Sequence, residues 1–431
     1  MLAAMKPDDL PFATAPLVQL ADRCVACGLC LPHCPTYRKT LSEADSPRGR
    51  IQLMKGVLEG HIPLNERFIE HIDLCLTCRA CENVCPNSVA YGELVDGVRV
   101  AIEAARQRSW LERFLRKLAL QGLLARPSRL EKLAPLLRFY QQSGLQRAVR
   151  RFGLLRWLGL EEIERQLPPI PRGFNWRETY PAIGTIRGEV GLFLGCVARI
   201  SDVTTLKAAI FILNRLGYTV HVPPAQTCCG ALHQHSGESR AAKQLAVQNL
   251  EAFALPNLLA VISTASGCGA MLAEYHQTLG KEAEPFAAKV TDLSAFLERA
   301  EGWSAIAMQP LREKIAVHDP CTLRNVMRKE KAPYAMLQRI PQAQVEALAG
   351  NDQCCGAAGT YFLSQPQMAG LLGDDKIRAM QEGGANWLAT SNVGCAMHFA
   401  DAARKAGLNI KVAHPATIVA RQMGFESNDA G

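Results

Sequence analysis

All sixteen cysteines of this 431-residue chain fall into four ordered groups. In two groups, three cysteines stand at two-residue gaps, a fourth follows after three residues, and a proline comes next. These runs are Cys24-Val-Ala-Cys27-Gly-Leu-Cys30-Leu-Pro-His-Cys34-Pro35 and Cys75-Leu-Thr-Cys78-Arg-Ala-Cys81-Glu-Asn-Val-Cys85-Pro86. The other eight cysteines belong to two sets built around the triplets Cys228-Cys229-Gly230 and Cys354-Cys355-Gly356. This pattern constrains the fold strongly, because each group has to be gathered at one place.

The spacing of the two runs indicates iron–sulfur clusters. Thiolates suit iron, and a C-x₂-C-x₂-C-x₃-C-P run is the bacterial ferredoxin pattern for a [4Fe–4S] cluster. In two-cluster ferredoxins the fourth cysteine of each run ligates the other cluster. We therefore predict two [4Fe–4S] clusters, the first held by Cys24, Cys27, Cys30 and Cys85, and the second by Cys75, Cys78, Cys81 and Cys34. Structural zinc is the alternative, but zinc sites seldom show this spacing twice.

Disulfide bonds are disfavoured as a use for so many cysteines. Residues 1–20 hold two aspartates and no unbroken apolar stretch, unlike a secretory signal, and Cys-x₂-Cys spacing inside a cell favours metal. No stretch reaches the roughly 18 apolar residues that span a bilayer. We therefore expect any membrane association to be peripheral or through a partner.

The region 188–421 contains an internal repeat. Cys196, Cys228 and Cys268 align with Cys321, Cys354 and Cys395 at offsets of 125, 126 and 127 residues. In the first half, apolar β-rich runs alternate with helical ones, which indicates α/β units. The expected strands are 190–194, 218–222 and 259–263, and the expected helices are 203–216 and 238–254.

The cysteines of the repeat are predicted to be further iron–sulfur ligands, for one or two more clusters. The two sets are Cys196, Cys228, Cys229 and Cys268, and Cys321, Cys354, Cys355 and Cys395. The first and last cysteine of each set are expected where a strand ends and a helix begins, a position at which backbone N–H groups and the helix dipole stabilise a thiolate. Structural or vestigial thiol sites are the alternative.

The predicted fold class is α+β with several domains. Helical patterns at 51–59 and 68–74 make the first domain an α-helical ferredoxin rather than a strand-rich one. The expected divisions are a poorly structured lead-in (1–20), the ferredoxin (21–100), a basic helical segment and linker (101–187), the first Cys-Cys-Gly domain (188–310), the second (311–421) and a flexible tail (422–431).

The net charge of +8 is concentrated in one segment. Residues 101–160 hold thirteen Arg and Lys against three Glu. Apolar residues at helical spacing (Trp110, Phe114, Leu115, Leu118, and later Phe152, Leu155 and Trp157) make the segment amphipathic, and Pro127, Pro135 and Gly144 are expected to divide it into short helices. It is interpreted as a surface for anionic lipid or a partner, or else as a solvated face. No nucleic-acid motif is clear, so no nucleic-acid partner is predicted.

Several charged residues and histidines stand near the cysteines. Arg48 and Arg50 are expected either to tune the charge of a cluster or to pair with acids. For His33, His318 and His398, which lie near predicted ligand cysteines, supporting or packing roles are favoured over ligation.

Taken together, these residues resemble the iron–sulfur subunit of glycolate oxidase (glycolate dehydrogenase). The resemblance covers nearly the whole chain. It is carried most clearly by Ser46-Pro-Arg-Gly-Arg-Ile51, Cys75-Leu-Thr-Cys78-Arg-Ala-Cys81, and Cys354-Cys-Gly-Ala-Ala-Gly-Thr-Tyr361 followed by Ser364-Gln-Pro-Gln-Met368. The domain order is also similar to that of a glycerol-3-phosphate dehydrogenase subunit, lactate-utilisation proteins and heterodisulfide reductase subunits.

The resemblance implies an electron-transfer subunit without catalytic residues of its own. A separate FAD-binding flavoprotein would oxidise glycolate to glyoxylate, and this chain would pass the electrons to a membrane quinone from the cytoplasmic face. No Gly-x-Gly-x-x-Gly loop follows a strand, so no flavin is expected on this chain. D-lactate and glycerol-3-phosphate are the alternative substrates of the complex.

A thiol–disulfide enzyme resembling heterodisulfide reductase and a zinc scaffold are the other readings. In the heterodisulfide reductase family the late cysteine opens a Cys-x₂-Cys pair that supplies a fifth ligand. Here the corresponding positions hold Met271 and His398, which argues against disulfide chemistry.

Overall fold

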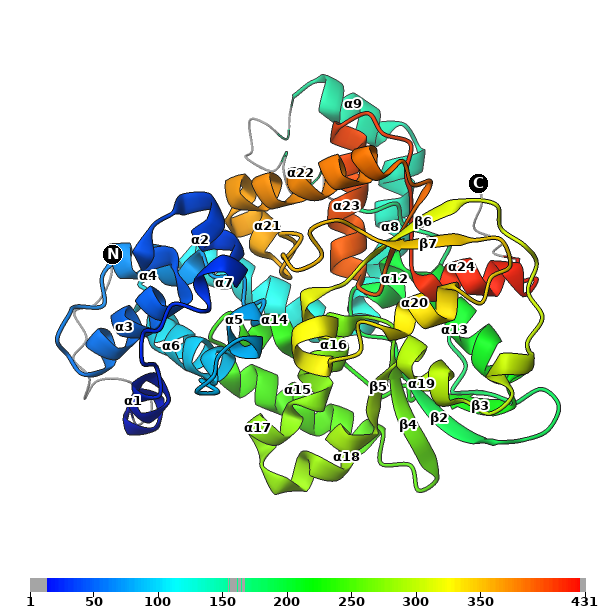
Figure 1. Ribbon diagram of the computed structural model, residues 1–431, viewed down its shortest axis with the longest axis horizontal. Coiled ribbons are helices and arrows are strands. Elements are labelled where there is room, and N and C mark those ends of the chain that lie inside the picture. The colour runs from blue at the N-terminus through cyan, green and yellow to red at the C-terminus, as the bar shows by residue number, and fades with distance from the viewer. Residues whose placement is uncertain (1–13, 154, 156–160, 162–163, 165–166, 427–431) are drawn as a thin grey trace.

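The computed structural model describes residues 14–153, 155, 161, 164 and 167–426. A helical region at the N-terminus is followed by a linker of helices and then by two α/β halves (Figure 1). The predicted class, α+β with a helical first region and two repeated α/β units, is therefore confirmed.

The first region is built from helices, and residues 14–105 contain no strand. Its core, which includes the fully buried Met54 and Ile72, lies among α1 (Ala15–Asp22), α3 (Pro47–Leu58), α4 (Glu66–Asp73) and α6 (Tyr91–Ala105). Short elements follow the cysteine runs: η2 (Leu31–His33), α2 (Pro35–Thr40), η3 (Glu43–Asp45) and α5 (Ala80–Asn83).

The predicted lead-in is wrong for its last residues. Residues 15–20 belong to α1, because Leu17 and Ala21, four positions apart, bury one face of this helix in the core of the first region. Residues 1–13 lie outside the described part of the chain, as do 427–431 of the predicted tail.

The linker consists of α7 (Trp110–Lys117), the π-helix η4 (Leu118–Leu124), α8 (Pro127–Gln142) and α9 (Leu145–Arg151). Pro127 begins α8 and Gly144, with φ of 82°, precedes α9, as predicted. The break expected at Pro135 is wrong, because α8 runs through this proline while the adjacent Ala134 is buried. Trp157 of the predicted amphipathic pattern lies outside the described residues.

The two α/β halves repeat the same sheet. The first sheet has the order β1-β3-β2-β4-β5, and the second has β7-β6-β8-β9. All neighbours are parallel except the added edge strand β1. The strands are β1 (Thr179–Tyr180), β2 (Gly188–Phe193), β3 (Tyr218–His221), β4 (Leu258–Ser263), β5 (Val290–Asp292), β6 (Lys314–His318), β7 (Gln344–Ala347), β8 (Trp387–Thr390) and β9 (Lys411–Ala413).

Helices cover both sheets, and the helices expected at 203–216 and 238–254 are present as α13 (Val203–Arg215) and α15 (Ser239–Ala252). Those of the first half are α12 (Ala198–Ser201), α13 (Val203–Arg215), α14 (Ala231–Gln234), α15 (Ser239–Ala252), α16 (Ser266–Ala273), α17 (Tyr275–Leu279), η5 (Lys281–Ala283), α18 (Glu284–Lys289), α19 (Leu293–Arg299) and η6 (Trp303–Ala305). Those of the second half are η7 (Leu323–Met327), α20 (Ala332–Leu337), α21 (Tyr361–Ser364), α22 (Pro366–Gly383), α23 (Val393–Lys405) and α24 (Pro415–Gln422).

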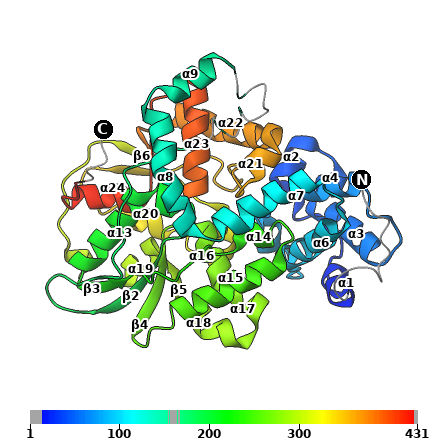
Figure 2. The ribbon, with the colours of Figure 1, turned by 180° about the vertical axis from the view of Figure 1, so that it is seen from behind.

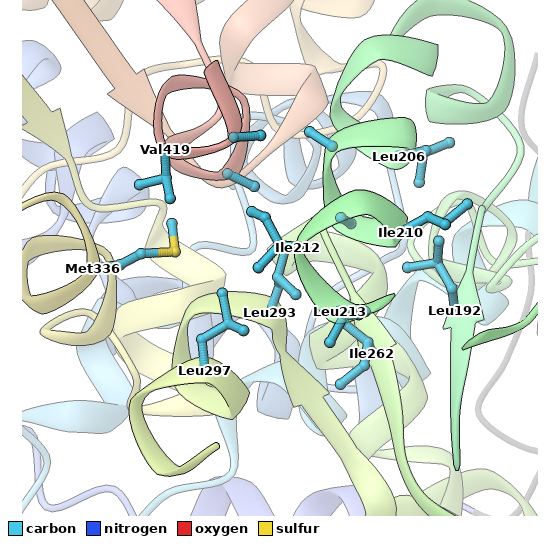
Figure 3. Close-up of a cluster of buried hydrophobic side chains, with 14 of the residues drawn as sticks. Leu192, Leu206, Ile210, Ile212, Leu213, Ile262, Leu293, Leu297, Met336 and Val419 are labelled. Atoms are coloured by element: carbon cyan, nitrogen blue, oxygen red, sulfur yellow. The ribbon is translucent and has the colours of Figure 1, made fainter. Parts of the chain in front are cut away.

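One hydrophobic core joins the two halves. Helix α13 packs against α24, and α19 packs against α20, and Figure 3 shows side chains of the first half meeting Met336 of α20 and Val419 of α24. Strand β6 shows the alternation that this requires: Ile315 and Val317 face the shared core, while Ala316 belongs to a separate cluster. Each fully buried Leu or Ile there contributes about 2 kcal/mol, so burial in this shared core stabilises the packing of the two halves against each other.

Candidate iron–sulfur centres

The eight cysteines of the first region line two pockets. Pocket one is lined by Cys24, Cys27, Cys30 and Cys85, and pocket two by Cys34, Cys75 and Cys78, while Cys81 lines both. The fourth cysteine of each run thus lies with the first three cysteines of the other. Pro47 and Tyr91 also line both pockets, so the two pockets are neighbours. All sixteen cysteines are free of disulfide bonds.

The backbone curls around each pocket in the same way. Ala26 and Gly28 have φ of 54° and 86° on either side of Cys27. Thr77 and Arg79 have φ of 52° and 57° on either side of Cys78. Positive φ is unfavourable for residues other than glycine. Its recurrence at matching positions shows that both runs wrap their second cysteine in one conformation.

Arg50, at the first turn of α3, supplies a buried charge to pocket two. Its side chain is 1% exposed; Nε donates to the His71 carbonyl at 2.7 Å and Nη1 to Thr36 Oγ1 at 3.0 Å. Nη1 also lies 3.9 Å from Cys34 Sγ. Burial opposes the charge, but Tyr91, the cysteines and Asp45 outweigh it and raise the pKa of Arg50 above its ordinary value.

The fit of pocket two to an iron–sulfur cluster rests on the atoms around it. Four soft thiols surround a hollow, and Arg50 Nη2 is buried without a hydrogen-bond partner. A buried N–H group normally finds an acceptor. A cluster held by Cys34, Cys75, Cys78 and Cys81 would bring sulfur acceptors and negative charge to this site, so the residues present suit such a group.

Arg48 lines pocket one, and it is 31% exposed and well paired. Its Nε and Nη2 donate to Glu43 at 2.6 and 3.3 Å, and its Nη1 donates to the Ala26 carbonyl at 3.0 Å. Burial raises the pKa of the Cys30 thiol in this pocket to about 11. The sequence predicted that these arginines either tune a cluster or pair with acids. Arg48 pairs with Glu43, whereas Arg50 lies 3.6 Å from Asp45 and keeps one buried N–H donor, Nη2, without a hydrogen-bond partner.

The eight cysteines of the repeat form two compact sets. In the second set, Cys355 and Cys395 have their Sγ atoms 3.3 Å apart, and those of Cys354 and Cys321 are 4.0 Å apart. In the first set, Cys228 lies close enough to Cys196 to raise the pKa of the Cys196 thiol, and Cys228 and Cys268 both act on the pKa of Cys229. The predicted members of each set are thus brought together.

The expected stabilisation of thiolates at helix starts is outweighed in this structure. Cys196 and Cys321 do follow strands, and Cys268 and Cys395 stand in the first turns of α16 and α23. However, a hydrogen bond to Cys228 and burial raise the pKa of Cys196 well above its ordinary value. A hydrogen bond to Cys354 and burial do the same for the pKa of Cys321. Thiols in these surroundings ionise readily only when a metal takes up their charge.

Gly230 and Gly356 show why each triplet ends in glycine. Their φ values are 89° and 94°. A Cβ atom at Gly356 would stand 2.8 Å from the carbonyl oxygen of Ala369 in α22. The backbone therefore passes close to a helix at this point, which a larger residue would prevent.

Each set also contains an arginine that was not among the predicted site residues. Arg199 and Arg324 stand three residues after the aligned Cys196 and Cys321, and each acts electrostatically on that cysteine. The repeat carries a signal for both, because Cys196-Val-Ala-Arg199 and Cys321-Thr-Leu-Arg324 occupy aligned positions. Arg199 also lies 3.1 Å from Glu131 of the linker.

The histidines have hydrogen-bonding and packing contacts. His318 is buried, its Nδ1 lies 3.0 Å from Thr390 Oγ1, and burial lowers its pKa well below the ordinary value. His398 Nε2 donates to the Ala369 carbonyl at 3.2 Å. His33 is half-buried in η2.

The second set lies directly beside pocket two. Burial raises the pKa of the Cys78 thiol, and Cys321 lies close enough to raise this pKa further. Asn325 Nδ2 donates to the Cys78 carbonyl at 2.7 Å, and Tyr361 OH donates to the Leu74 carbonyl at 2.9 Å. These contacts join residues more than 240 positions apart.

The first set lies instead beneath the linker. Leu124, Ala125 and Leu130 pack on the cluster that contains Cys196, Cys228 and Cys229. Thr227 Oγ1 donates to the Ala125 carbonyl at 2.6 Å. The two sets are alike in sequence, but they have different neighbours.

Comparison with known proteins decides the family. Residues 20–89 match a 4Fe-4S dicluster domain, residues 111–167 match the linker region of the glycolate oxidase iron–sulfur subunit, and residues 190–273 and 315–400 match a cysteine-rich domain. A Bacillus subtilis protein named "Probable glycolate oxidase iron-sulfur subunit" is 36% identical over 94% of both chains. The Escherichia coli glycolate oxidase iron–sulfur subunit is 33% identical over 88% of this chain and 90% of that protein.

This chain belongs to the glycolate oxidase iron–sulfur subunit family. Lactate utilization protein A of Halalkalibacterium halodurans is a more distant relative, 29% identical over 54% of this chain and 97% of that protein. The matched domains indicate iron–sulfur clusters, and an electron-transfer role within an oxidoreductase complex fits them. In the described part of the chain, no helix has the length and apolar character to cross a bilayer.

Proposed function

We propose that this chain is the electron-transfer subunit of a glycolate dehydrogenase complex. An FAD-binding flavoprotein subunit oxidises glycolate to glyoxylate, and the electrons pass through this chain towards a membrane quinone. The observation that carries the proposal is the grouping of eight thiols around two adjacent pockets, in a chain related over 94% of its length to a protein of this name.

The proposed ligands follow the pockets. Cys24, Cys27, Cys30 and Cys85 hold cluster one, and Cys75, Cys78, Cys81 and Cys34 hold cluster two. The two Cys-Cys-Gly sets hold one or two more clusters. When bound, such clusters accept and release single electrons. The chain's own residues position the sulfurs and supply positive charge to pocket two through Arg50.

The substrate of the complex is chosen by the flavoprotein. D-lactate is the second candidate, because the lactate utilization proteins cover about half of this chain. The Cys-Cys-Gly sets as thiol–disulfide catalysts are disfavoured, since the two positions where a fifth ligand would stand are the buried Met271 and the hydrogen-bonded His398.

We also propose that the chain lies on the cytoplasmic face of the membrane through α7 and α8. Trp110, Phe114 and Leu118, at four-residue spacing, are 74%, 57% and 45% exposed, while Leu120 faces inward and is buried. On α8, Leu136 and Phe139 are 64% and 63% exposed. Figure 2 shows both helices on the near face of the molecule. An outward apolar face among many basic residues suits an anionic lipid surface.

The test is purification of the tagged chain without oxygen from its native host, followed by addition of glycolate or D-lactate. Bleaching of the visible absorbance by glycolate, with a flavoprotein co-purified, is the expected result. Bleaching by D-lactate alone would reassign the substrate and keep the electron-transfer role. A colourless, zinc-containing chain would contradict the proposal as a whole.

A further inference from the structure

We propose that Arg50 raises the reduction potential of cluster two and so directs electrons from cluster one into cluster two. This inference rests on the proposed function, because it requires a cluster in each pocket. Arg50 acts as a positioning and electrostatic residue that donates a hydrogen bond and a positive charge to the group held by Cys34, Cys75, Cys78 and Cys81.

The free donor of Arg50 is the first observation. Nε and Nη1 are satisfied by His71 and Thr36, which fixes the plane of the guanidinium group. Nη2 is buried and has no hydrogen-bond partner. It lies 3.6 Å from Asp45 Oδ1, too far for a hydrogen bond. Because Arg50 lines pocket two, a sulfur atom of the cluster is the acceptor that fits.

The second observation is that the charge of Arg50 is only partly balanced. Asp45 Oδ1 already lies 2.9 Å from His71 Nδ1, so this carboxylate is shared. Both Arg50 and Asp45 are buried, so water screens the field of Arg50 weakly. A nearby positive charge and hydrogen bonds to sulfur favour the more negative, reduced form of a cluster. Arg50 therefore raises the potential of cluster two.

The third observation is the contrast with Arg48, two residues away on the same helix. Arg48 lines pocket one, but Glu43 takes two of its hydrogen bonds and the side chain reaches solvent. The field of Arg48 at pocket one is therefore neutralised and screened, whereas that of Arg50 at pocket two is only partly balanced by Asp45 and is little screened by water. The two arginines of one short segment, Pro47-Arg-Gly-Arg50, thus produce different electrostatic fields at the two pockets.

A higher reduction potential in cluster two would move electrons towards the second Cys-Cys-Gly set, because pocket two is the pocket beside that set. Cys78 of this pocket is the cysteine that approaches Cys321 of the second Cys-Cys-Gly set. A higher potential in cluster two draws electrons away from pocket one, where Cys27 is exposed, and towards the interior of the protein.

The experiment is an anaerobic redox titration of the complete chain, followed by electron paramagnetic resonance. The variants are R50Q, R50K, D45N and, as the matched control, R48Q. In R50Q we expect the ratio of reduced to oxidised cluster two to fall at least tenfold at a fixed potential, which is about 59 mV for one electron. R50K should give a smaller fall, because the charge stays and the fork of donors is lost.

D45N should change the same ratio in the opposite direction, because it removes a negative charge and keeps the acceptor oxygen for His71. R48Q should leave cluster two unchanged within twofold. An R50Q variant that holds cluster two at the wild-type potential would overturn the inference. If the R50Q variant does not bind cluster two, the D45N variant is the deciding test. An unchanged ratio of reduced to oxidised cluster two in D45N would then overturn the inference. A wild-type chain lacking the two clusters would instead contradict the proposed function.

Discussion

The hydroxyl group of Tyr361 donates a 2.9 Å hydrogen bond to the carbonyl of Leu74, the residue before Cys75. One partner belongs to the second α/β half and the other to the helical first region. Tyr361 also packs with Leu76 and Cys354 in a small buried cluster between pocket two and the second set. The two regions are therefore fixed to each other at the point where electrons are proposed to cross.

Replacing Tyr361 by Phe removes this bond and keeps the ring. A hydrogen bond of this kind is worth about 1 kcal/mol, so we expect amide hydrogen exchange around Cys75 to become about fivefold faster. The control is Y37F, since the structure gives Tyr37 OH no hydrogen bond in the described part of the chain. Equal protection in Y361F and wild type would show that packing alone holds the regions together.

The exchange of fourth cysteines between the pockets predicts a crossed pattern of cluster loss. C34S should remove or alter cluster two and leave cluster one, although Cys34 belongs to the first run. C85S should do the reverse. Iron analysis should give a loss of about four iron atoms in each variant, and electron paramagnetic resonance should show which signal remains. Loss of the signal from the variant's own run would refute the assignment.

The exposed face of α7 predicts binding to anionic vesicles. The double variant W110S/F114S should bind vesicles that contain phosphatidylglycerol at least about tenfold more weakly than wild type. L259S is the control, because Leu259 is also exposed (57%) but lies on β4. Co-sedimentation is the measurement, and phosphatidylcholine vesicles should bind little of either protein. Undiminished binding by W110S/F114S would exclude this face, and binding to the flavoprotein alone would assign it to a protein partner.

Buried Asp292 predicts a pH dependence of stability. Burial raises the pKa of this carboxyl group from 3.8 to about 6. The neutral acid is therefore favoured in the folded state, and its contribution to stability is complete below pH 3.8 and is lost as the pH rises through 6. D292N keeps the acceptor for the Ser294 N–H and cannot ionise.

We therefore expect wild type to lose up to about 3 kcal/mol relative to D292N as the pH rises from 4 to 7. Thermal unfolding of both proteins at a series of pH values measures this. A constant difference in melting temperature between them would show that Asp292 does not titrate in this range.

The sequence could predict the parts whose chemistry or periodicity is local. The ferredoxin runs, the offsets of the repeat and the strands β2, β3 and β4 all follow from spacing or from short apolar runs. Other features depend on tertiary contacts. The strand β1 pairs antiparallel with β3 through only two residues, Thr179 and Tyr180, and carries little pattern of its own.

In the site too, some features follow from the local sequence and others depend on tertiary contacts. The two sets of the repeat are nearly symmetric in sequence, so nothing in the spacing of Cys228 or Cys354 says which set lies beside pocket two. The answer depends on Asn325 and Tyr361, which reach across the fold to the carbonyls of Cys78 and Leu74. Likewise, the periodicity of α7 predicts an apolar face, but only the structure shows that this face points outward.

The shared core determines the order in which parts of the protein can finish folding during synthesis. Helix α24, which ends at Gln422, packs against α13 of the first half, whose residues are made about two hundred positions earlier. A ribosome that has completed the first set of cysteines has therefore not yet made the helix that closes the core behind them. The helical first region, whose core is complete by Ala105, can fold early, whereas the core that the two Cys-Cys-Gly halves share is complete only once α24 has been made.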